Sequence, residues 1–308
     1  MSPDVGLPET YADLMSIHRM GHAFYHPEHA HNVRPGTCGY INNSGQWQPI
    51  VDLTDEAALA AGSFKPLTQL LIKATPDEFA WEDVTSEGVH SNKPSISVGA
   101  DGSTVGVPAE ASVEFSLEKS VSAGAVLLCN STVHRKGYRH ESPFLEWGKA
   151  NANAIIKNCK DAKRYGFWVV LTTWTCSSVW TNVWKNSQKS VSIGITARSA
   201  GIGELSPRIE WSNSQSGGGW VHPTPTMKNG KVDQRVIFFS GVKFKVYKLP
   251  FGAVTREVRG TETIIVDDPD DVTKPENERM RYEFEISVEG AAEDKEEMEE
   301  EDEEEDEG

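Results

Sequence analysis

The segment FWVVLTTWTCSSVWTNVW, residues 167–184, constrains the fold more than any other stretch of the chain. Side chains of an extended chain point alternately to its two sides, and here the side that begins with Phe167 and the side that begins with Trp168 both mix apolar and polar residues. The segment predicts one long strand, and SVSIGITA at 190–197 is its expected hairpin partner. Taken alone, this pattern is typical of a long hairpin in a soluble β-sandwich or barrel.

Further segments predict a body of mixed helices and strands. Ser142 and Pro143 begin a helix that Gly166 ends, and basic residues stand in its last turn. TCGYI and WQPIVDL form a hairpin around residues 42–45, because asparagine, serine and glycine favour tight turns. The other predicted elements are a short helix over 11–20, a helical piece over 54–61, a β unit of residues 95–107 and 111–117, and strands at 208–211, 235–239 and 242–249.

The charge of the chain is divided unevenly. Residues 293–307 hold 13 acidic residues against one lysine, a net charge of −12, and residues 261–290 hold ten acidic against three basic residues, a net charge of −7. Because the whole chain carries −16, residues 1–260 carry about +3. The composition changes beyond Pro250, so we place a boundary near Gly252 and expect the glutamate-rich tail, about 291–308, to be disordered.

Several protein classes are disfavoured by the sequence. Four cysteines lack the spacing of a disulfide framework, and MSPDVGLPET is not a signal peptide, so we expect an intracellular protein. Apolar runs fall far short of the ~20 residues that a spanning helix needs. The phosphate-binding loop, the nucleophile elbow and the dinucleotide fingerprint are missing, so we expect no enzyme and no cofactor. The acidic tail and the lack of a base-stacking module disfavour nucleic-acid binding.

Histidines crowd the N-terminal region, and their types and spacing raise the question of a metal. The set His26, His29 and His31 with Cys38 has side chains that ligate zinc, but its spacing matches no structural zinc module. We therefore predict loop and helix histidines and no metal site. The five histidines of the cluster are His18, His22, His26, His29 and His31.

The order of these elements resembles a known family. A first helix, the TCGYI/WQPIVDL hairpin, a long alternating hairpin, a basic helix leading into RYGFWVV, a second long hairpin and the closing RVIFFSGVKFKVYKL strands are similar to the gasdermin pore-forming domain. With its short C-terminal piece, the chain is most similar to the fungal gasdermin-like cell-death proteins. The resemblance covers roughly residues 8–252. It implies an α+β fold with a twisted, mostly antiparallel sheet, long extendable hairpins and several short helices.

The resemblance also implies a function in regulated cell death. Residues 1–252 would be the pore-forming domain, held inactive in the cytoplasm by the short acidic segment 253–308. Once released, by an activating protease or by pairing with a variant partner, the domain would bind acidic phospholipid membranes, assemble with further copies of itself and form a transmembrane β-barrel in the plasma membrane or another cell membrane. A closed ring of strands is required there because lipid cannot satisfy free backbone groups.

The two long hairpins are the segments expected to insert. A spanning strand needs ~9 to 11 residues with apolar and polar sides in alternation, and aromatic residues near the interfaces. The residues expected to enter or border the membrane are Ile96, Val98, Val105, Val107, Val113, Phe115, Leu117, Trp174, Val179, Trp180, Val183, Trp184, Val191, Ile193 and Ile195, with Trp47 as an interfacial anchor or else a core tryptophan.

Basic and acidic residues are the expected partners of lipid and of the inhibitory segment. Each basic residue near an anionic leaflet contributes ~1 kcal/mol, although a solvated helix face would carry the same charges. The predicted lipid-binding residues are Arg19, Arg135, Lys136, Arg139, Lys149, Lys157, Lys160, Lys163 and Arg164. The predicted inhibitory residues are Asp267, Asp268, Asp270, Asp271, Glu296 and Glu297. Titration of the N-terminal histidines would make membrane binding stronger in acid.

A second function class fits the same sequence. The chain would then be a soluble, β-rich binding or scaffold module whose acidic tail keeps it in solution. This hypothesis predicts that removal of the tail changes solubility and little else.

Overall fold

A computed structural model describes residues 6–81, 83–92, 111–129, 131–185, 190–196, 208–210, 219–224, 227–228, 231–249, 262–271 and 279–290. The fold is α+β with antiparallel sheets, as the alternating segments predict. Its helices are α1 (Leu7–Met15), α2 (Glu56–Ala61), α3 (Ser142–Asn158) and α4 (Ala162–Tyr165), with the 3-10 turns η1 (Ser16–His18) and η2 (Pro269–Asp271).

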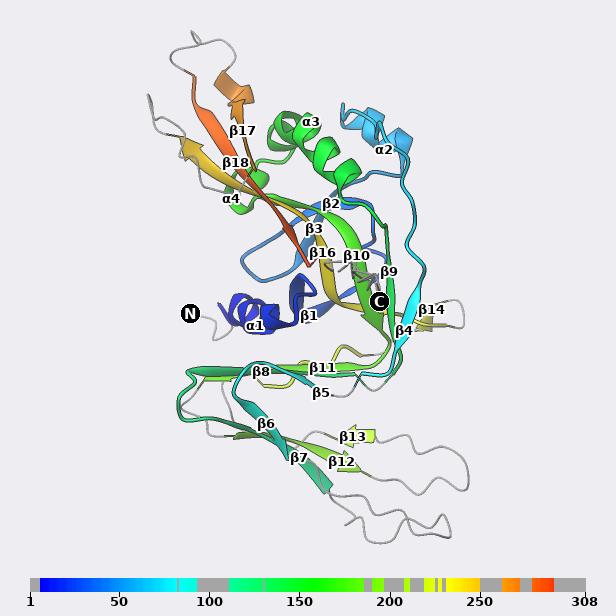
Figure 1. Ribbon diagram of the computed structural model, residues 1–308, viewed down its shortest axis with the longest axis vertical. Coiled ribbons are helices and arrows are strands. Elements are labelled where there is room, and N and C mark those ends of the chain that lie inside the picture. The colour runs from blue at the N-terminus through cyan, green and yellow to red at the C-terminus, as the bar shows by residue number, and fades with distance from the viewer. Residues whose placement is uncertain are drawn as a thin grey trace, which may run out of the picture.

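A large antiparallel sheet forms the centre of the molecule (Figure 1). Its strand order is β17-β18-β16-β10-β2-β3, while β1 also pairs with β16, β9 with β10, and β4 with β9. The strands are β1 (His22–His29), β2 (Thr37–Ile41), β3 (Trp47–Asp52), β4 (Asp77–Phe79), β9 (Val133–Gly137), β10 (Phe167–Cys176), β16 (Arg235–Leu249), β17 (Glu262–Asp267) and β18 (Arg281–Glu289).

Two smaller sheets are stacked at the end of the molecule opposite α3 and β17 (Figure 1). One has the order β11-β8-β5 and the other β13-β12-β7-β6. Their strands are β5 (Asp83–Thr85), β8 (Ala123–Cys129) and β11 (Val179–Lys185) in the first, and β6 (Val89–Asn92), β7 (Ala111–Leu117), β12 (Ser190–Thr196) and β13 (Arg208–Glu210) in the second. A two-stranded ribbon, β14 (Met227–Lys228) and β15 (Lys231–Val232), completes the strands.

The basic helix follows its sequence signals closely. It begins at Ser142, one residue earlier than Pro143, and is interrupted at Cys159, where the backbone is extended, before α4 continues to Tyr165. Gly166 then takes a φ of 71°, and a Cβ at this position would collide with the carbonyl oxygen of Phe244. Only glycine fits there, so the predicted helix stop also fixes how the chain enters β10.

The prediction of one uninterrupted strand over 167–184 is wrong. The strand breaks at Ser177 and Ser178, whose backbone N–H groups both donate to the Ser131 hydroxyl, at 3.1 and 3.3 Å. This side chain, from the segment between β8 and β9, takes the place of ladder hydrogen bonds, so β10 lies in the large sheet and β11 in a small one. The expected pairing of 190–197 with this segment is also wrong, because β12 pairs with β7 and β13.

Candidate functional site

The two small sheets are halves of one ribbon that is folded over. Lys185 faces Ala123 at the end of the β11–β8 ladder, and Ser190 faces Ser116 at the start of the β12–β7 ladder. From the first pair to the second, one strand advances by five residues and the other by seven, so the same two stretches of chain are paired in both sheets and the two registers differ by only two residues. We call β5, β8 and β11 the proximal half, and β6, β7, β12 and β13 the distal half, of this folded ribbon.

The folded ribbon also continues the large sheet. Thr175 of β10 faces His134 of β9, and Val179 of β11 then faces Cys129 of β8, so the same two stretches of chain pair again beyond the break at Ser177. On one outer side β4 pairs with β9, β5 with β8, and β6 with β7. On the other outer side Val221 bridges to Thr181 and β13 pairs with β12. The ribbon is therefore up to four strands wide and is bent once along its length.

The distal half is amphipathic. Val113 and Phe115 of β7 and Val191 and Ile193 of β12 are 7% exposed or less, whereas Glu114, between the first two, is exposed. The four apolar side chains lie in one core cluster with Trp180, Trp184 and Trp220. One face of the distal half thus packs on the proximal half while its polar face is turned to solvent, which is the alternation of a strand with two different environments.

The other face of the proximal half is covered by the N-terminal elements. Val179 and Val183 are 1% exposed and lie in a cluster with Tyr11 and Met15 of α1 and Tyr25 of β1. Both faces of β11 are therefore buried, which answers why its sequence has no water face. The mixed pattern arises because the strand is the middle layer of three.

Polar atoms on β11 are buried without hydrogen bonds among the described residues. The side chain of Asn182 is 1% exposed, and neither its amide nitrogen nor its oxygen has a partner. The indole nitrogens of Trp180 and Trp184 are also buried and unpaired. Each such group costs about 1 to 3 kcal/mol, because burial removes its water without replacing it. The folded ribbon therefore holds polar groups that would be better satisfied with water nearby.

The structure brings most of the predicted inserting residues together. Leu117 is partly buried beside the cluster that joins the two halves, and Trp174 is 7% exposed in β10, where the ribbon leaves the large sheet. For Ile195 the backbone pairing with Ala111 is described. Ile96, Val98, Val105 and Val107 lie outside the described residues.

A hairpin of β17, η2 and β18 forms the edge of the large sheet next to β16. β18 pairs with β16 at nine consecutive positions, from Gly241 opposite Glu289 to Leu249 opposite Arg281. Phe284 is fully buried and Ile286 is 5% exposed in the core that contains α3. The C-terminal hairpin is thus part of the body. That residues 1–252 form a domain of their own stays a prediction.

Carboxylates of the C-terminal hairpin bind two of the predicted lipid-binding lysines. The Lys163 ammonium lies 2.8 Å from Asp268 Oδ1 and 2.9 Å from Asp270 Oδ2, and the Lys149 ammonium lies 2.5 Å from Glu262 Oε1. Burial alone would lower the pKa of Lys163, but its hydrogen bonds to the two aspartates raise it above the ordinary value. Burial likewise raises the pKa of Asp268, yet hydrogen bonding to Lys163 brings it below the ordinary value.

Three acidic residues of the contact were missed from the sequence. Besides Glu262, Glu289 lies 2.9 Å from Lys243, and Glu285 lies 3.8 Å from Lys245 and accepts a hydrogen bond from the Tyr247 hydroxyl. The sequence does indicate this contact. Two glutamates in RYEFEISVE, Glu283 and Glu285, are two residues apart, and two lysines in VKFKVYKL, Lys243 and Lys245, have the same spacing, which suits opposite charges on neighbouring strands.

Not every predicted inhibitory acid contacts the body in the same way. Asp267 lies 3.6 Å from Arg279, and Asp271 accepts a hydrogen bond from the Met280 N–H, so both bond within the C-terminal hairpin itself. Glu296 and Glu297 lie outside the described residues.

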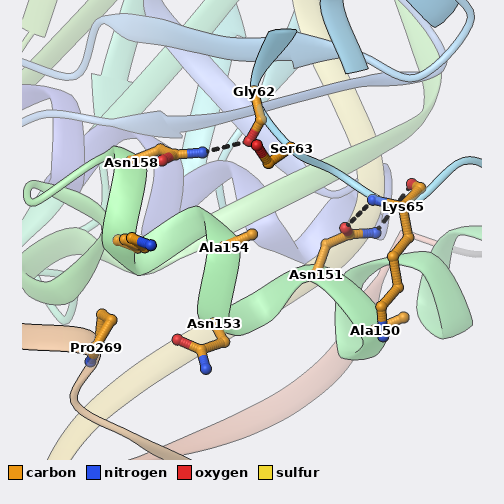
Figure 2. A pocket seen from close by; sticks show the side chains of 10 residues that line it. Gly62, Ser63, Lys65, Ala150, Asn151, Asn153, Ala154, Asn158 and Pro269 are labelled. Atoms are coloured by element: carbon orange, nitrogen blue, oxygen red, sulfur yellow. Dashed lines mark hydrogen bonds between the residues drawn. The ribbon is translucent and has the colours of Figure 1, made fainter. Parts of the chain in front are cut away.

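A cavity of about 460 Å³ lies between α3 and the C-terminal hairpin (Figure 2). Its walls are the turn 62–65, one side of α3 and Pro269. The turn is tied to α3, since the Asn151 side chain accepts from the Lys65 N–H at 2.6 Å and Asn158 donates to the Gly62 carbonyl at 2.6 Å. Lys157 also lines the cavity, so its polar wall carries two lysines. The cavity has one wall from the C-terminal hairpin and therefore depends on it.

The remaining predicted lipid-binding residues are mostly exposed. Arg135 is the exception, because its guanidinium lies 3.5 Å from Asp77 and 5.9 Å from the ring centroid of Trp174. Arg164 lies over the ring of Tyr165 at 5.1 Å. The exposed residues are Arg19, Lys136, Arg139, Lys157, Lys160 and Arg164.

In this structure Trp47 is a core tryptophan, one of the two alternatives that the sequence left open, and its interfacial role stays a prediction. Trp47 is 4% exposed and packs edge-on against Phe239 at 5.5 Å. Its ring fills the space above Gly39, where a Cβ would lie 2.5 Å from the carbonyl oxygen of Gln48. The turn next to Trp47 was predicted correctly, with Gly45 at a φ of 71° and the Asn42 side chain accepting two backbone N–H bonds.

The N-terminal histidines have different environments. His22 is half-buried and its ring lies against those of Phe24, Trp168 and Phe239; desolvation, aided by the charge of Lys243, lowers its pKa to about 3. The expected titration near neutral pH is therefore wrong for His22, because the cation cannot be solvated there.

Cys38 is fully buried in the core beneath α3, in a different cluster from His22. Burial raises the pKa of the Cys38 thiol well above its ordinary value. His29 and His31, in contrast, lie beside Asp233.

Comparisons with known proteins do not assign the chain. No family model matches it, and no curated protein sequence matches it. Among the described residues, no helix has both the length and the apolar character needed to cross a membrane.

Proposed function

We propose that the protein is a masked pore-forming effector of regulated cell death, in which the folded ribbon straightens and inserts into an acidic phospholipid membrane. Several copies would then close their ribbons into one transmembrane β-barrel. The resemblance to gasdermins supports this proposal, and the structure supports it through the features described above.

The observation that carries the proposal is that the same two stretches of chain pair with each other in both halves of the folded ribbon. Strands that are already paired on both sides of the bend can straighten without exchanging partners. The strands β11 and β12 have seven residues each and together exceed the ~9 to 11 residues that a tilted spanning strand needs. The distal half supplies the apolar and polar faces that a barrel wall requires.

The C-terminal hairpin has the properties expected of a mask. Its carboxylates occupy Lys149 and Lys163, which are then not free to bind lipid phosphates. It also occupies the edge of β16, and a free edge strand is where a second copy can add its own strand. One segment therefore opposes both membrane binding and assembly.

Dye release from acidic-phospholipid liposomes tests the proposal. The full chain is compared with a chain that ends at Gly252, because a cut alone would leave β18 paired at nine positions. We expect leakage from the short chain and not from the full chain, and no leakage from neutral liposomes. Circular dichroism shows whether the short chain is folded.

The other outcomes are equally informative. Leakage from both chains would mean pore formation without C-terminal masking. If a folded short chain stays monomeric and releases no dye, the proposal is wrong and the soluble binding module is the better account.

A further inference from the structure

We infer that His29, His31 and Asp233 form a binding site for a borderline divalent cation of the zinc type. The three side chains come from two separate segments: His29 ends β1 and His31 lies in the turn after it, while Asp233 comes just before β16. One ligand atom from each lies within 4.8 Å of the others. Two imidazoles and a carboxylate are a ligand set that zinc uses, with further positions left for water.

The segments that carry the ligands are held in place before any metal binds. The N–H groups of Asn32 and Val33 donate to the His29 carbonyl, at 2.9 and 3.3 Å, and Val33 is 1% exposed in the core. The Ala30 N–H donates to the Gln234 carbonyl at 3.0 Å, which joins the turn to the residue after Asp233. A site whose backbone is already ordered loses less entropy on binding.

The chemistry of the cluster suits a cation. The Asp233 carboxylate and His29 Nδ1 form a close hydrogen bond, so the carboxylate is already directed at the imidazole. Burial raises the pKa of Asp233, but the hydrogen bond from His29 and nearby positive charge lower it below the ordinary value, so the group is ionised at neutral pH. His31 is exposed and can rotate, which allows ligand atoms that lie within 4.8 Å of one another to adopt the ~3.3 Å separation set by zinc bond lengths.

Other charged groups face the cluster and modify its affinity. Arg235 is a cation near Asp233 and opposes metal binding. Glu28 is an acid that interacts with both Arg235 and His29, and its carboxylate accepts the Trp47 N–H at 3.1 Å. Because Arg235 and Glu28 have opposite formal charges, their effects on a bound cation oppose each other, and the three ligands themselves set the affinity. Bound metal would fasten the turn after β1 to the segment that enters β16.

Zinc titration of the metal-stripped full chain by calorimetry tests the inference. We expect about one zinc per chain. His31→Ala and Asp233→Asn should each weaken binding at least tenfold, since loss of a ligand exceeds the 10- to 100-fold effect of an outer-shell change. His31 is exposed and outside the sheets, so its removal leaves the fold intact. His140→Ala removes an exposed histidine elsewhere and should leave the affinity unchanged.

Two further readouts separate this site from incidental binding by other histidines. Zinc should raise the thermal midpoint of the unaltered chain and of His140→Ala, and should not raise that of His31→Ala. Binding should also weaken in mild acid, because the imidazoles must lose their protons to bind metal. The inference is overturned if no stoichiometric zinc binds, or if His31→Ala and Asp233→Asn bind as tightly as His140→Ala.

Discussion

Replacement of Lys163 by alanine should loosen the C-terminal hairpin. The Lys163 and Asp268 side chains are 16% and 13% exposed, so removal of the ammonium leaves a largely buried carboxylate without its cation, bonded only to the Asp270 N–H and the Tyr282 hydroxyl among the described residues. Hydrogen bonds to charged groups contribute ~1.5 to 3 kcal/mol, and the contact with Asp270 adds little because that side chain is 60% exposed. We therefore expect a loss of about 2 kcal/mol, which corresponds to roughly a 30-fold rise in the population with the hairpin opened.

Hydrogen–deuterium exchange of the β18 amides measures this opening directly. Their exchange rates should rise by the same factor in Lys163→Ala, because these amides exchange through opening of the hairpin. Lys160→Ala is the matched control, since Lys160 is exposed and belongs to the same basic segment. If β18 exchanges equally fast in the two variants, Lys163 does not hold the hairpin and the reasoning fails. Under the proposed function, Lys163→Ala should also release dye as a full chain.

Three further changes have defined outcomes. The folded-state pKa of Asp268 is lowered and that of Lys163 is raised, so the ion pair stabilises the hairpin between about pH 5 and pH 10, and this stabilisation is lost as the pH falls through the pKa of Asp268. Exchange rates of the β18 amides, corrected for their intrinsic pH dependence, should therefore stay constant from about pH 5 to 9 and rise below about pH 4. Asn182→Leu should raise the stability in thermal unfolding by ~1 to 3 kcal/mol, whereas Asn151→Leu, at an equally buried but fully bonded asparagine, should lower it. Gly39→Ala should destabilise the chain by about 1 to 3 kcal/mol in denaturant titrations, because its Cβ would overlap the Trp47 ring.

Local sequence signals predicted the parts of the fold that local chemistry decides. The hairpin at 37–52 and the helix that ends at Gly166 follow from turn residues and from a position that only glycine can occupy. The alternation of acids and lysines in β18 and β16 also predicts their pairing, although it was not used for that purpose.

The folded ribbon was not predictable in the same way. The break at Ser177 depends on the hydroxyl of Ser131, 46 residues away in the sequence, and no local pattern indicates that contact. The side chains of β11 are buried on both faces because α1 and the distal half cover them, and their alternation alone suggested a hairpin with β12. For the same reason Trp47 could be identified as interfacial or as core only after its partners were placed.

The folded ribbon also sets the energetic terms of the proposed insertion. Because the same strands are paired on both sides of the bend, straightening would keep the ladder hydrogen bonds of each half and would give up chiefly the packing between the two halves. Loss of the buried Val113, Phe115, Val191 and Ile193 contacts would cost ~1.5 to 3 kcal/mol for each side chain in water, or ~6 to 12 kcal/mol in total. Burial of the same apolar face in the hydrocarbon core of the membrane would recover about the same free energy. In water the ribbon should therefore stay folded, and a membrane surface is the condition that makes the straight form accessible.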